Sequence, residues 1–211
     1  MRVLKDIHLV ENTTANVYIV EIEHLVAIDA GLPESLDKVL NYVNELGRKP
    51  EDLSLIIVTH GHYDHVGALR KLKEVTGAKV AAHRDEVDYV EGQKQLGRYR
   101  AEPVKVDIVL SHGDVLFNRF EIVHTPGHTP GSICILDRET KALFVGDLVY
   151  EDNGRLYEIP HEYSLDPVKN REAIAQLLEL DFKHVLPSHG KPLLNRGREA
   201  LQQLVNEVRG V

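Results

Sequence analysis

The sequence predicts an α/β (or α+β) protein built from two sheets with helices on their outer sides. Segments rich in Val and Ile alternate with amphipathic helical segments, in the order β-rich, helix, strand, helix, β-rich, helix, strand and helix. The length of 211 residues fits a single domain over residues 1–211, without a repeated sequence, a low-complexity tract or a linker. Outer helices on two sheets would cover every apolar face of such a chain.

The first part of the chain carries the signals of a β-meander followed by helices and buried strands. Its opening residues alternate apolar and polar positions in part, as half-buried strands do. Pro33 and Gly47 flank the first helical pattern at its start and its end, where these residue types are favoured. "LSLIIV" is a continuous apolar run, typical of a strand buried on both faces. The predicted elements are a meander over residues 1–31, a helix over 36–46, a strand over 53–58, a helix over 69–76 and a strand over 79–83.

The second part of the chain predicts a flap, a further β-rich stretch and two helices. Residues 84–103 are polar and contain two glycines, a proline and two tyrosines, which indicates a short helix and a mobile flap. Short apolar runs between turn residues predict strands within residues 104–146. Asp166 and Pro167 supply an N-cap and a first-turn proline for the next helix. A strand near "HVLP" and a final helix follow, the helix carrying Leu201, Leu204, Val205 and Val208.

The composition limits the partners of the protein. A formal net charge of -8, without a block of Lys and Arg, argues against nucleic acid as the main partner. No apolar run reaches the roughly 18 to 20 residues that span a bilayer, so no membrane partner is expected. "MRVLKDIHLV" lacks the apolar core of a signal peptide and Cys134 is the only cysteine, so we expect a cytoplasmic location. The expected partner is a small-molecule substrate, and a homodimer through residues 84–103 or the final helix is an open alternative.

The stretch "VTHGHYDHVG" places His60, His62, Asp64 and His65 within six positions. It follows a predicted buried strand and precedes a helix, so its side chains should converge beyond the carboxyl end of the strand, where α/β proteins place ligands. Imidazole and carboxylate groups are ligands of divalent zinc, manganese and iron. A solvated polar loop is the alternative, but the H-x-H-x-D-H spacing favours a metal site.

Three further segments supply matching residues after predicted strands. "HTPGHTPGS" contains His128, "FVGDLVY" contains Asp147, and "VLPSHGKP" contains His189. With these segments the chain resembles the metallo-β-lactamase fold family, and within it the small glyoxalase II-like and lactonase-like metallohydrolases. The resemblance covers nearly the whole chain, and it implies a four-layer αββα sandwich with a metal site at one edge of the paired sheets.

The resemblance also implies the ligands of two divalent metal ions, with zinc expected and manganese or iron as alternatives. It assigns one ion to His60, His62 and His128. It assigns the other to Asp64, His65 and His189, with Asp147 as the bridge between them. Such a set leaves open positions on both metals, as in a catalytic site.

The implied activity is that of a dinuclear metal-dependent hydrolase. A metal-bridging hydroxide would cleave a small ester, thioester or lactone, because the metals lower the pKa of the water and polarise the substrate. Asp64 would in addition accept a hydrogen bond from this hydroxide and fix its direction. Asp29 resembles the early aspartate of the family, which supports the ligands from behind, although a plain turn role is the alternative.

Other candidate residues have less specific signals. His124 shares a segment with His128 and is expected at a strand end, with a supporting role near the ligands as an option. His161, Tyr150 and Tyr157 lie where the fold varies with substrate and could line the pocket, with packing as the alternative for the tyrosines.

The closest alternative activity is that of a persulfide dioxygenase-like oxidoreductase with a single iron, held by His60, His128 and Asp147 on the same scaffold. A diiron domain that partners a flavodoxin ranks lower, because the chain has no Gly-rich flavin-binding segment. A dedicated β-lactamase is not expected, because the commonest class B β-lactamases use a cysteine as a ligand of the second metal, whereas Cys134 falls inside a predicted strand. The acidic charge argues against a nuclease.

Overall fold

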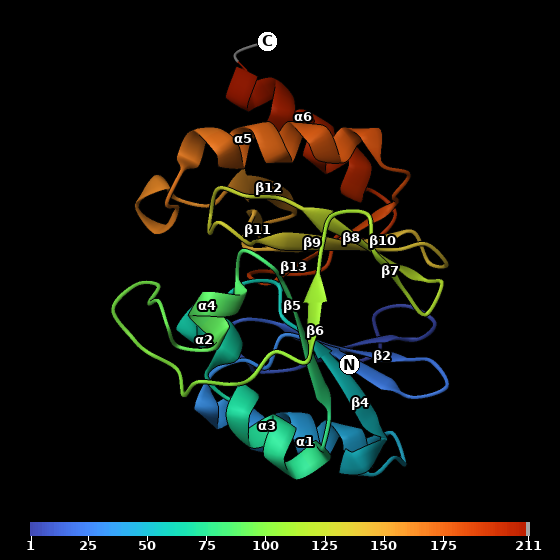
Figure 1. The fold of residues 1–211 in the computed structure, drawn as a ribbon. Helices are drawn as coiled ribbons and strands as arrows, with labels where there is room; N and C mark the ends of the chain where they lie inside the picture. Colours follow the sequence, from blue (N-terminus) through green and yellow to red (C-terminus); the bar gives the residue numbers. More distant parts are fainter. Residues whose placement is uncertain (210–211) are drawn as a thin grey trace. The chain divides into compact units, whose positions relative to one another are not determined.

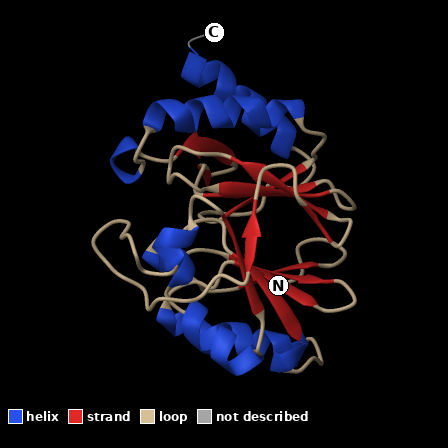
Figure 2. Cartoon of the chain, in the orientation of Figure 1, coloured by secondary structure: helices blue, strands red, loops and turns tan. Residues whose placement is uncertain are grey.

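The computed structural model describes residues 1–209, and the chain divides into two compact units. Unit 1 comprises Met1–Leu110 and unit 2 comprises Ser111–Val211. Each unit is a mixed sheet with helices on one face, which confirms the predicted α/β class (Figure 2). The prediction of a single domain stays a prediction. Among the described residues, no helix has both the length and the apolar character needed to cross a membrane.

Unit 1 contains a six-stranded sheet in the order β1-β2-β3-β4-β5-β6 (Figure 1). The first three strands pair antiparallel and the last three continue in parallel. The strands are β1 (Ile7–Val10), β2 (Val17–Glu21), β3 (Leu25–Ile28), β4 (Leu53–Ile57), β5 (Lys79–His83) and β6 (Ile108–Leu110). The helices are α1 (Leu36–Glu45), α2 (Tyr63–Val66), α3 (Leu69–Thr76) and α4 (Val87–Val90), with 3-10 turns at η1 (Pro33–Ser35) and η2 (Pro50–Asp52).

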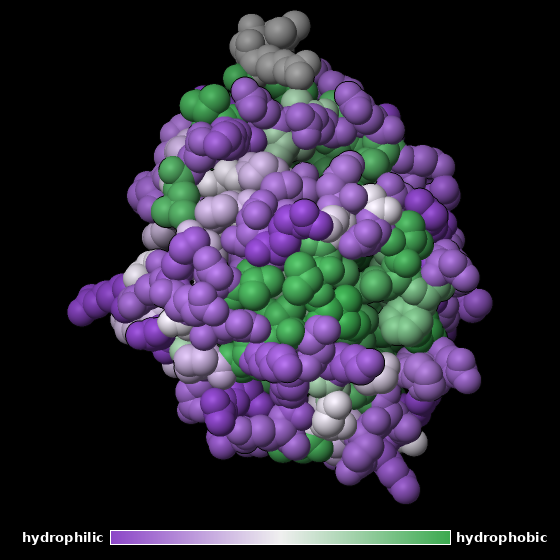
Figure 3. Space-filling model, in the orientation of Figure 1, coloured by the Kyte–Doolittle hydropathy of each residue, from purple (hydrophilic) through white to green (hydrophobic). Residues whose placement is uncertain are grey.

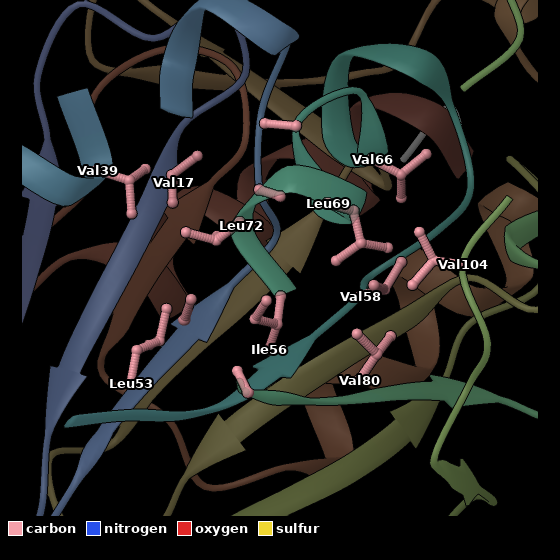
Figure 4. Packing of buried hydrophobic residues seen from close by; sticks show 14 of the residues in the cluster. Val17, Val39, Leu53, Ile56, Val58, Val66, Leu69, Leu72, Val80 and Val104 are labelled. Carbon is pink, nitrogen blue, oxygen red and sulfur yellow. The ribbon is translucent and has the colours of Figure 1, made fainter. Parts of the chain in front are cut away.

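The core of unit 1 lies between the sheet and the helices α1 and α3. Val39 and Val43 of α1 and Leu69 and Leu72 of α3 are almost completely buried in one apolar cluster with the strands. Figure 4 shows side chains of this cluster, including Ile56 of β4, which packs among them. Each such buried side chain stabilises the fold by about 1.5 to 3 kcal/mol, so this packing fixes the strand end that precedes "HGHYDH".

Unit 2 contains a five-stranded sheet in the order β13-β10-β9-β8-β7 and a separate hairpin of β11 and β12. The strands are β7 (Val115–Leu116), β8 (Phe120–His124), β9 (Ile133–Asp137), β10 (Ala142–Gly146), β11 (Val149–Asp152), β12 (Arg155–Glu158) and β13 (His184–Pro187). The helices are α5 (Pro167–Gln176) and α6 (Gly197–Arg209), with 3-10 turns at η3 (His161–Tyr163) and η4 (Leu177–Glu179).

The helices of unit 2 begin and pack as the sequence indicates. The Asp166 side chain accepts a hydrogen bond from the Lys169 backbone nitrogen at 3.1 Å and so caps α5. Ile174 of α5 and Leu201 of α6 are buried against the sheet in the second apolar cluster. In Figure 3 the exposed side chains over α5 and over α3 are mostly hydrophilic, as expected for helices that bury one face.

The predicted helices and most predicted strands are confirmed, and three details differ. The helix after the histidine cluster is preceded by an additional turn, α2, inside the cluster itself. β6 lies within the stretch assigned to the second β-rich region, but it pairs in parallel with β5 of unit 1. The hairpin of β11 and β12 was not predicted, although Asn153 and Gly154 are a strong hairpin turn signal and both have positive φ.

Candidate metal centre

The metal-binding motif of unit 1 lies directly after the carboxyl end of β4. His60 and His65 are almost fully buried, and the backbone nitrogen of His65 bonds to the carbonyl of His62 at 2.9 Å in the turn of α2. The ring centroid of His60 lies 4.9 Å from that of His62 and 3.9 Å from that of His65. The Asp64 carboxylate lies 3.7 Å from Nε2 of His65. We call His60, His62, Asp64 and His65 the unit 1 cluster.

A buried carboxylate forms hydrogen bonds to the unit 1 cluster and to the residue before it. Asp29 accepts hydrogen bonds from the backbone nitrogen of Thr59 at 2.7 Å, from the Thr59 hydroxyl at 2.7 Å and from Nδ1 of His65 at 2.8 Å. Since the Thr59 hydroxyl donates to Asp29, it can accept from Nδ1 of His60, which lies 3.2 Å away. The imidazoles of His60 and His65 are therefore both held by hydrogen bonds at Nδ1, and Nε2 lies on the opposite edge of each ring. Metal-binding histidines are commonly held in this way.

The backbone at Asp29 is adapted to this role. Asp29 has a φ of 61°, in the left-handed region that costs an aspartate about 1 kcal/mol or more. Its backbone nitrogen donates to the carbonyl of Ile57 at 2.9 Å, and three donors satisfy its carboxylate. Of the two predicted roles of Asp29, the structure shows the one that orients His65.

A second buried carboxylate fixes the peptide between two of the predicted ligands. Glu86 accepts a hydrogen bond from the backbone nitrogen of Gly61 at 2.7 Å, and its side chain is completely buried. A Cβ at Gly61 would lie 3.1 Å from Cβ of Tyr89, so a side chain fits poorly here. Glu86 lies in a polar stretch that carries no motif, so its role was not predictable from the sequence.

The three predicted ligands of unit 2 also lie together. His128 follows β8, Asp147 follows β10 and His189 follows β13. Oδ2 of Asp147 lies 3.6 Å from Nε2 of His128 and 3.4 Å from Nε2 of His189. His128 and Asp147 are buried, whereas the side chain of His189 is 30% exposed. We call these three residues the unit 2 cluster.

Strand pairing explains why Asp147 and His189 meet. β10 and β13 are neighbouring parallel strands, with Gly146 opposite Pro187. Carboxyl ends of parallel strands share one edge of a sheet, so the residues that follow them are close neighbours. The backbone nitrogen of Ser188 donates to the carbonyl of Gly146 at 3.2 Å, which joins the two segments next to the ligands.

The remaining segments of the unit 2 cluster are held by backbone contacts. The carbonyl of His128 accepts a hydrogen bond from the backbone nitrogen of Leu165 at 3.1 Å. The carbonyl of His189 accepts one from the backbone nitrogen of Glu151 at 2.9 Å. The Glu151 side chain in turn accepts from the backbone nitrogen of Lys191 at 2.5 Å and from that of Gly154 at 2.6 Å. Glu151, which no sequence motif marks, therefore connects the His189 loop to the hairpin of β11 and β12 through hydrogen bonds.

Both clusters have the donor chemistry of a transition-metal site. Unit 1 offers three imidazoles and a carboxylate, and unit 2 offers two imidazoles and a carboxylate. In unit 1 the potential ligand atoms of His60 and His62 lie within 4.8 Å of each other. Zinc, manganese and iron accept this set of nitrogen and oxygen ligands, so the residues fit the metals that the sequence implied. The assignment of individual ligands to individual ions stays a prediction.

The other candidate residues have structural contacts of their own. Nε2 of His124 donates to the carbonyl of Pro130 at 2.8 Å. Tyr150 and Tyr157 stack across the hairpin with their ring centroids 5.4 Å apart. His161 lies 3.0 Å from a guanidinium nitrogen of Arg171. A role of these residues in lining the substrate pocket stays a prediction.

The chain is similar to known proteins of one superfamily. Residues 11–189 match the metallo-beta-lactamase superfamily. The probable metallo-hydrolase YflN of Bacillus subtilis is 27% identical over 244 residues, which cover 98% of this chain and 92% of that protein. The acyl-coenzyme A thioesterase MBLAC2 of Gallus gallus is 31% identical over 201 residues, which cover 83% of this chain and 72% of that protein.

A solved structure shows the same fold. BJP-1, a subclass B3 metallo-beta-lactamase of Bradyrhizobium japonicum, aligns with a TM-score of 0.76 and 23% identity, over 100% of this chain and 92% of that chain. The predicted family resemblance and fold class are confirmed by these matches. The prediction of a metal-dependent hydrolase is confirmed at the level of the enzyme class.

Proposed function

Because the chain belongs to the metallo-beta-lactamase superfamily, we propose that it is a dinuclear metal-dependent hydrolase that cleaves acyl thioesters. The observation that carries the proposal is the pair of clusters, in which seven imidazole and carboxylate side chains lie at strand ends. Asp29 binds the imidazole of His65, and Glu151 binds the backbone of the loop that carries His189. A small ester or a lactone is the alternative substrate of the same centre.

The proposed ligand sets combine the two clusters as the family resemblance implies. As the resemblance implies, His60, His62 and His128 would hold one divalent ion, and Asp64, His65 and His189 would hold the other. Asp147 would serve both ions, because its carboxylate lies 3.6 Å from Nε2 of His128 and 3.4 Å from Nε2 of His189. When bound, such ions lower the pKa of water and polarise a substrate carbonyl.

The residues of the chain orient the attacking water and the metal ligands. The Asp64 side chain is 30% exposed, so its carboxylate can reach water, accept a hydrogen bond from it and fix its direction. Asp29 keeps His65 in the tautomer with the proton on Nδ1, so that Nε2 is the nitrogen available as a ligand. Glu86 and Glu151 hold the loops of His62 and His189, which limits the movement of ligands during the reaction.

A thioester is favoured by its chemistry and by similarity. The leaving thiol has a pKa of about 8.5, so it departs as a thiolate with less help from a general acid than an alkoxide needs. The 31% identical relative, aligned over 83% of this chain, is named an acyl-coenzyme A thioesterase. Both points support the thioester class without specifying the acyl group.

A substrate panel tests the proposal. The zinc-loaded protein is assayed with a thioester, an oxygen ester and a lactone that share one acyl chain, before and after removal of metal with a chelator. We expect the highest kcat/KM for the thioester, loss of activity on chelation and recovery when zinc is restored. Oxygen consumption with a persulfide by an iron-loaded sample, with no hydrolysis of any ester, would overturn the proposal in favour of the dioxygenase.

A further inference from the structure

We propose that the segment of residues 92–103, called the flap below, binds the thiol part of the substrate through Arg98 and Tyr99, and that this thiol carries a phosphorylated nucleotide. The inference rests on the proposed thioesterase function and names the substrate class of the same site. It depends on three features of unit 1: the contact of the flap with the metal-binding motif, its fixed base, and an exposed cation beside an exposed aromatic ring.

The flap contacts the metal-binding motif directly. A Cβ at Gly97 would lie 4.0 Å from Cδ2 of His62, and Cδ1 of the buried Leu96 would lie 3.4 Å from a Cβ at Gly61. The ring of Tyr99 lies 5.7 Å from that of Tyr63, the residue after His62. In Figure 1 the flap is the long light-green loop that extends beside α2 and α4. A group bound at Tyr99 therefore lies next to a predicted metal ligand.

The flap is anchored at its base and is shaped into a turn at its tip. The backbone nitrogen of Val104 donates to the carbonyl of Val90 at 3.0 Å, and the Arg70 side chain donates to the carbonyl of Pro103 at 3.3 Å. At the tip, the Gln95 amide donates to the carbonyls of Gly97 and Arg98 at 3.2 and 3.3 Å. These contacts give the tip a defined shape, which lowers the entropy cost of binding a ligand there.

The tip presents a cation and an aromatic face to solvent. Tyr99 is 63% exposed, and the guanidinium of the exposed residue Arg98 lies 5.8 Å from the centroid of the Tyr99 ring. Lys94 is paired with Asp88 at 2.8 Å, and Arg100 donates to the carbonyl of Gly92. Across residues 1–209, the structure shows no carboxylate bound to the Arg98 guanidinium, so this charge is available to an anionic ligand.

The charge of the flap is opposite to that of the whole chain. The flap contains three cationic side chains and one carboxylate, whereas the chain has a formal net charge of -8. A local positive segment on an acidic protein attracts an anionic substrate to that segment and disfavours it elsewhere. The flap thus has the charge expected of a subsite for an anionic leaving group.

Arginine next to an exposed tyrosine matches a phosphorylated nucleotide better than a small carboxylate. A guanidinium binds phosphate through paired hydrogen bonds, and aromatic and guanidinium planes stack on nucleotide bases. A peptide thiol such as glutathione offers carboxylates but no ring that could stack on Tyr99. The combination favours a coenzyme A thioester over a glutathione thioester.

The test compares two thioesters with the same acyl group. One carries coenzyme A and the other N-acetylcysteamine, which lacks the nucleotide. We expect Arg98→Ala to lower kcat/KM for the coenzyme A thioester by about tenfold, as loss of a charged hydrogen bond does, and to leave the short thioester unchanged. Arg98→Lys should show a smaller loss, because it retains the charge without the planar group. The control Lys71→Ala removes an exposed cation that is paired with Glu74 outside the flap, and it should match the unchanged protein.

A binding measurement separates this proposal from the proposed function. Calorimetry with adenosine 3′,5′-bisphosphate alone should show binding to the unchanged protein and to Lys71→Ala, and about tenfold weaker binding to Arg98→Ala. Absence of nucleotide binding, equal losses on both thioesters, or a higher kcat/KM for a glutathione thioester that falls in Arg98→Ala would overturn the subsite. Failure to hydrolyse any thioester, together with Arg98-dependent nucleotide binding, would refute the proposed function while supporting the subsite.

Discussion

Nδ1 of His65 donates a hydrogen bond to the buried carboxylate of Asp29 at 2.8 Å, and Asp29 has a left-handed backbone. The same carboxylate accepts two hydrogen bonds from Thr59, the residue directly before His60. The residue that directly follows β3 therefore sets the ring orientation of a predicted ligand that follows β4. This relationship connects the parallel pairing of β3 and β4 with the chemistry of the site.

Asp29→Asn is expected to weaken zinc binding by about 10- to 100-fold, because a carboxylate that holds a metal-binding histidine also raises its basicity. Competitive titration with a chromogenic chelator measures this change. Asp37→Asn, at an exposed position of α1, serves as the matched control and should leave affinity unchanged. Equal zinc affinity in both variants would show that Asp29 fulfils only a turn role.

Asp64→Asn is expected to lower kcat by about 100-fold or more at saturating zinc, because the neutral amide replaces the charged carboxylate that orients the attacking oxygen. Steady-state kinetics with a thioester measures the effect, and metal content is determined on the same sample. Asp181→Asn removes an exposed acid paired with Lys141 and should retain full activity. A kcat within a few-fold of the unchanged protein would refute the proposed role of Asp64.

Gly190→Ala is expected to lower the free energy of unfolding by about 2 kcal/mol or more and to disturb His189. Gly190 has a φ of +98°, and a Cβ there would lie 2.1 Å from the carbonyl oxygen of Glu151. Gly113 is a matched control, since it has a φ of +84° but no neighbouring atom within 4 Å of the new Cβ. Urea denaturation should give a loss of only about 1 kcal/mol for Gly113→Ala. Similar losses in both variants would mean that the contact with Glu151 is unimportant.

Cys134 is expected to be unreactive in the folded protein. Burial raises the pKa of its thiol from 9.0 to about 12, and only the thiolate attacks thiol reagents. At pH 8 the protein should react with a disulfide reagent slowly in buffer and rapidly in urea. Fast labelling of the folded protein would contradict the buried position in β9.

The raised pKa of the Cys134 thiol also predicts how the free energy of unfolding depends on pH. The unfolded thiol ionises near pH 9 and the folded thiol only near pH 12, so the stabilising contribution is complete below pH 9 and is lost between these values. Stability measured between pH 8.5 and 10.5 should therefore fall less steeply in Cys134→Ala than in the unchanged protein. If the free energy of unfolding fell equally steeply with pH in both proteins, the raised pKa of Cys134 would be contradicted.

Sequence patterns could identify the ligands but not the residues that hold them. All seven predicted ligands lie in two clusters, because each follows a strand end and a motif with fixed spacing marks it. Glu86 and Glu151 were missed, since their hydrogen bonds to Gly61 and Lys191 join positions 25 and 40 residues apart. Such contacts depend on tertiary structure, and an isolated glutamate carries no signal for them.

The fold was predictable where periodicity was strong. The buried run of β4 and the capped helix α5 were identified from local patterns. The strand that pairs with β6 was not identified, because a short apolar strand has the same sequence pattern in either sheet. The cytoplasmic location, the small-molecule partner and a homodimer stay predictions.

Metal content of the purified protein tests the central claim most directly. Elemental analysis is made on the unchanged protein, on His62→Ala, and on His24→Ala as a control at an exposed histidine outside both clusters. We predict about two zinc or manganese ions per chain in the unchanged protein and in His24→Ala, and a clear loss of metal in His62→Ala. A fully metallated and active His62→Ala variant, or a single iron per chain in the unchanged protein, would contradict the dinuclear hydrolase.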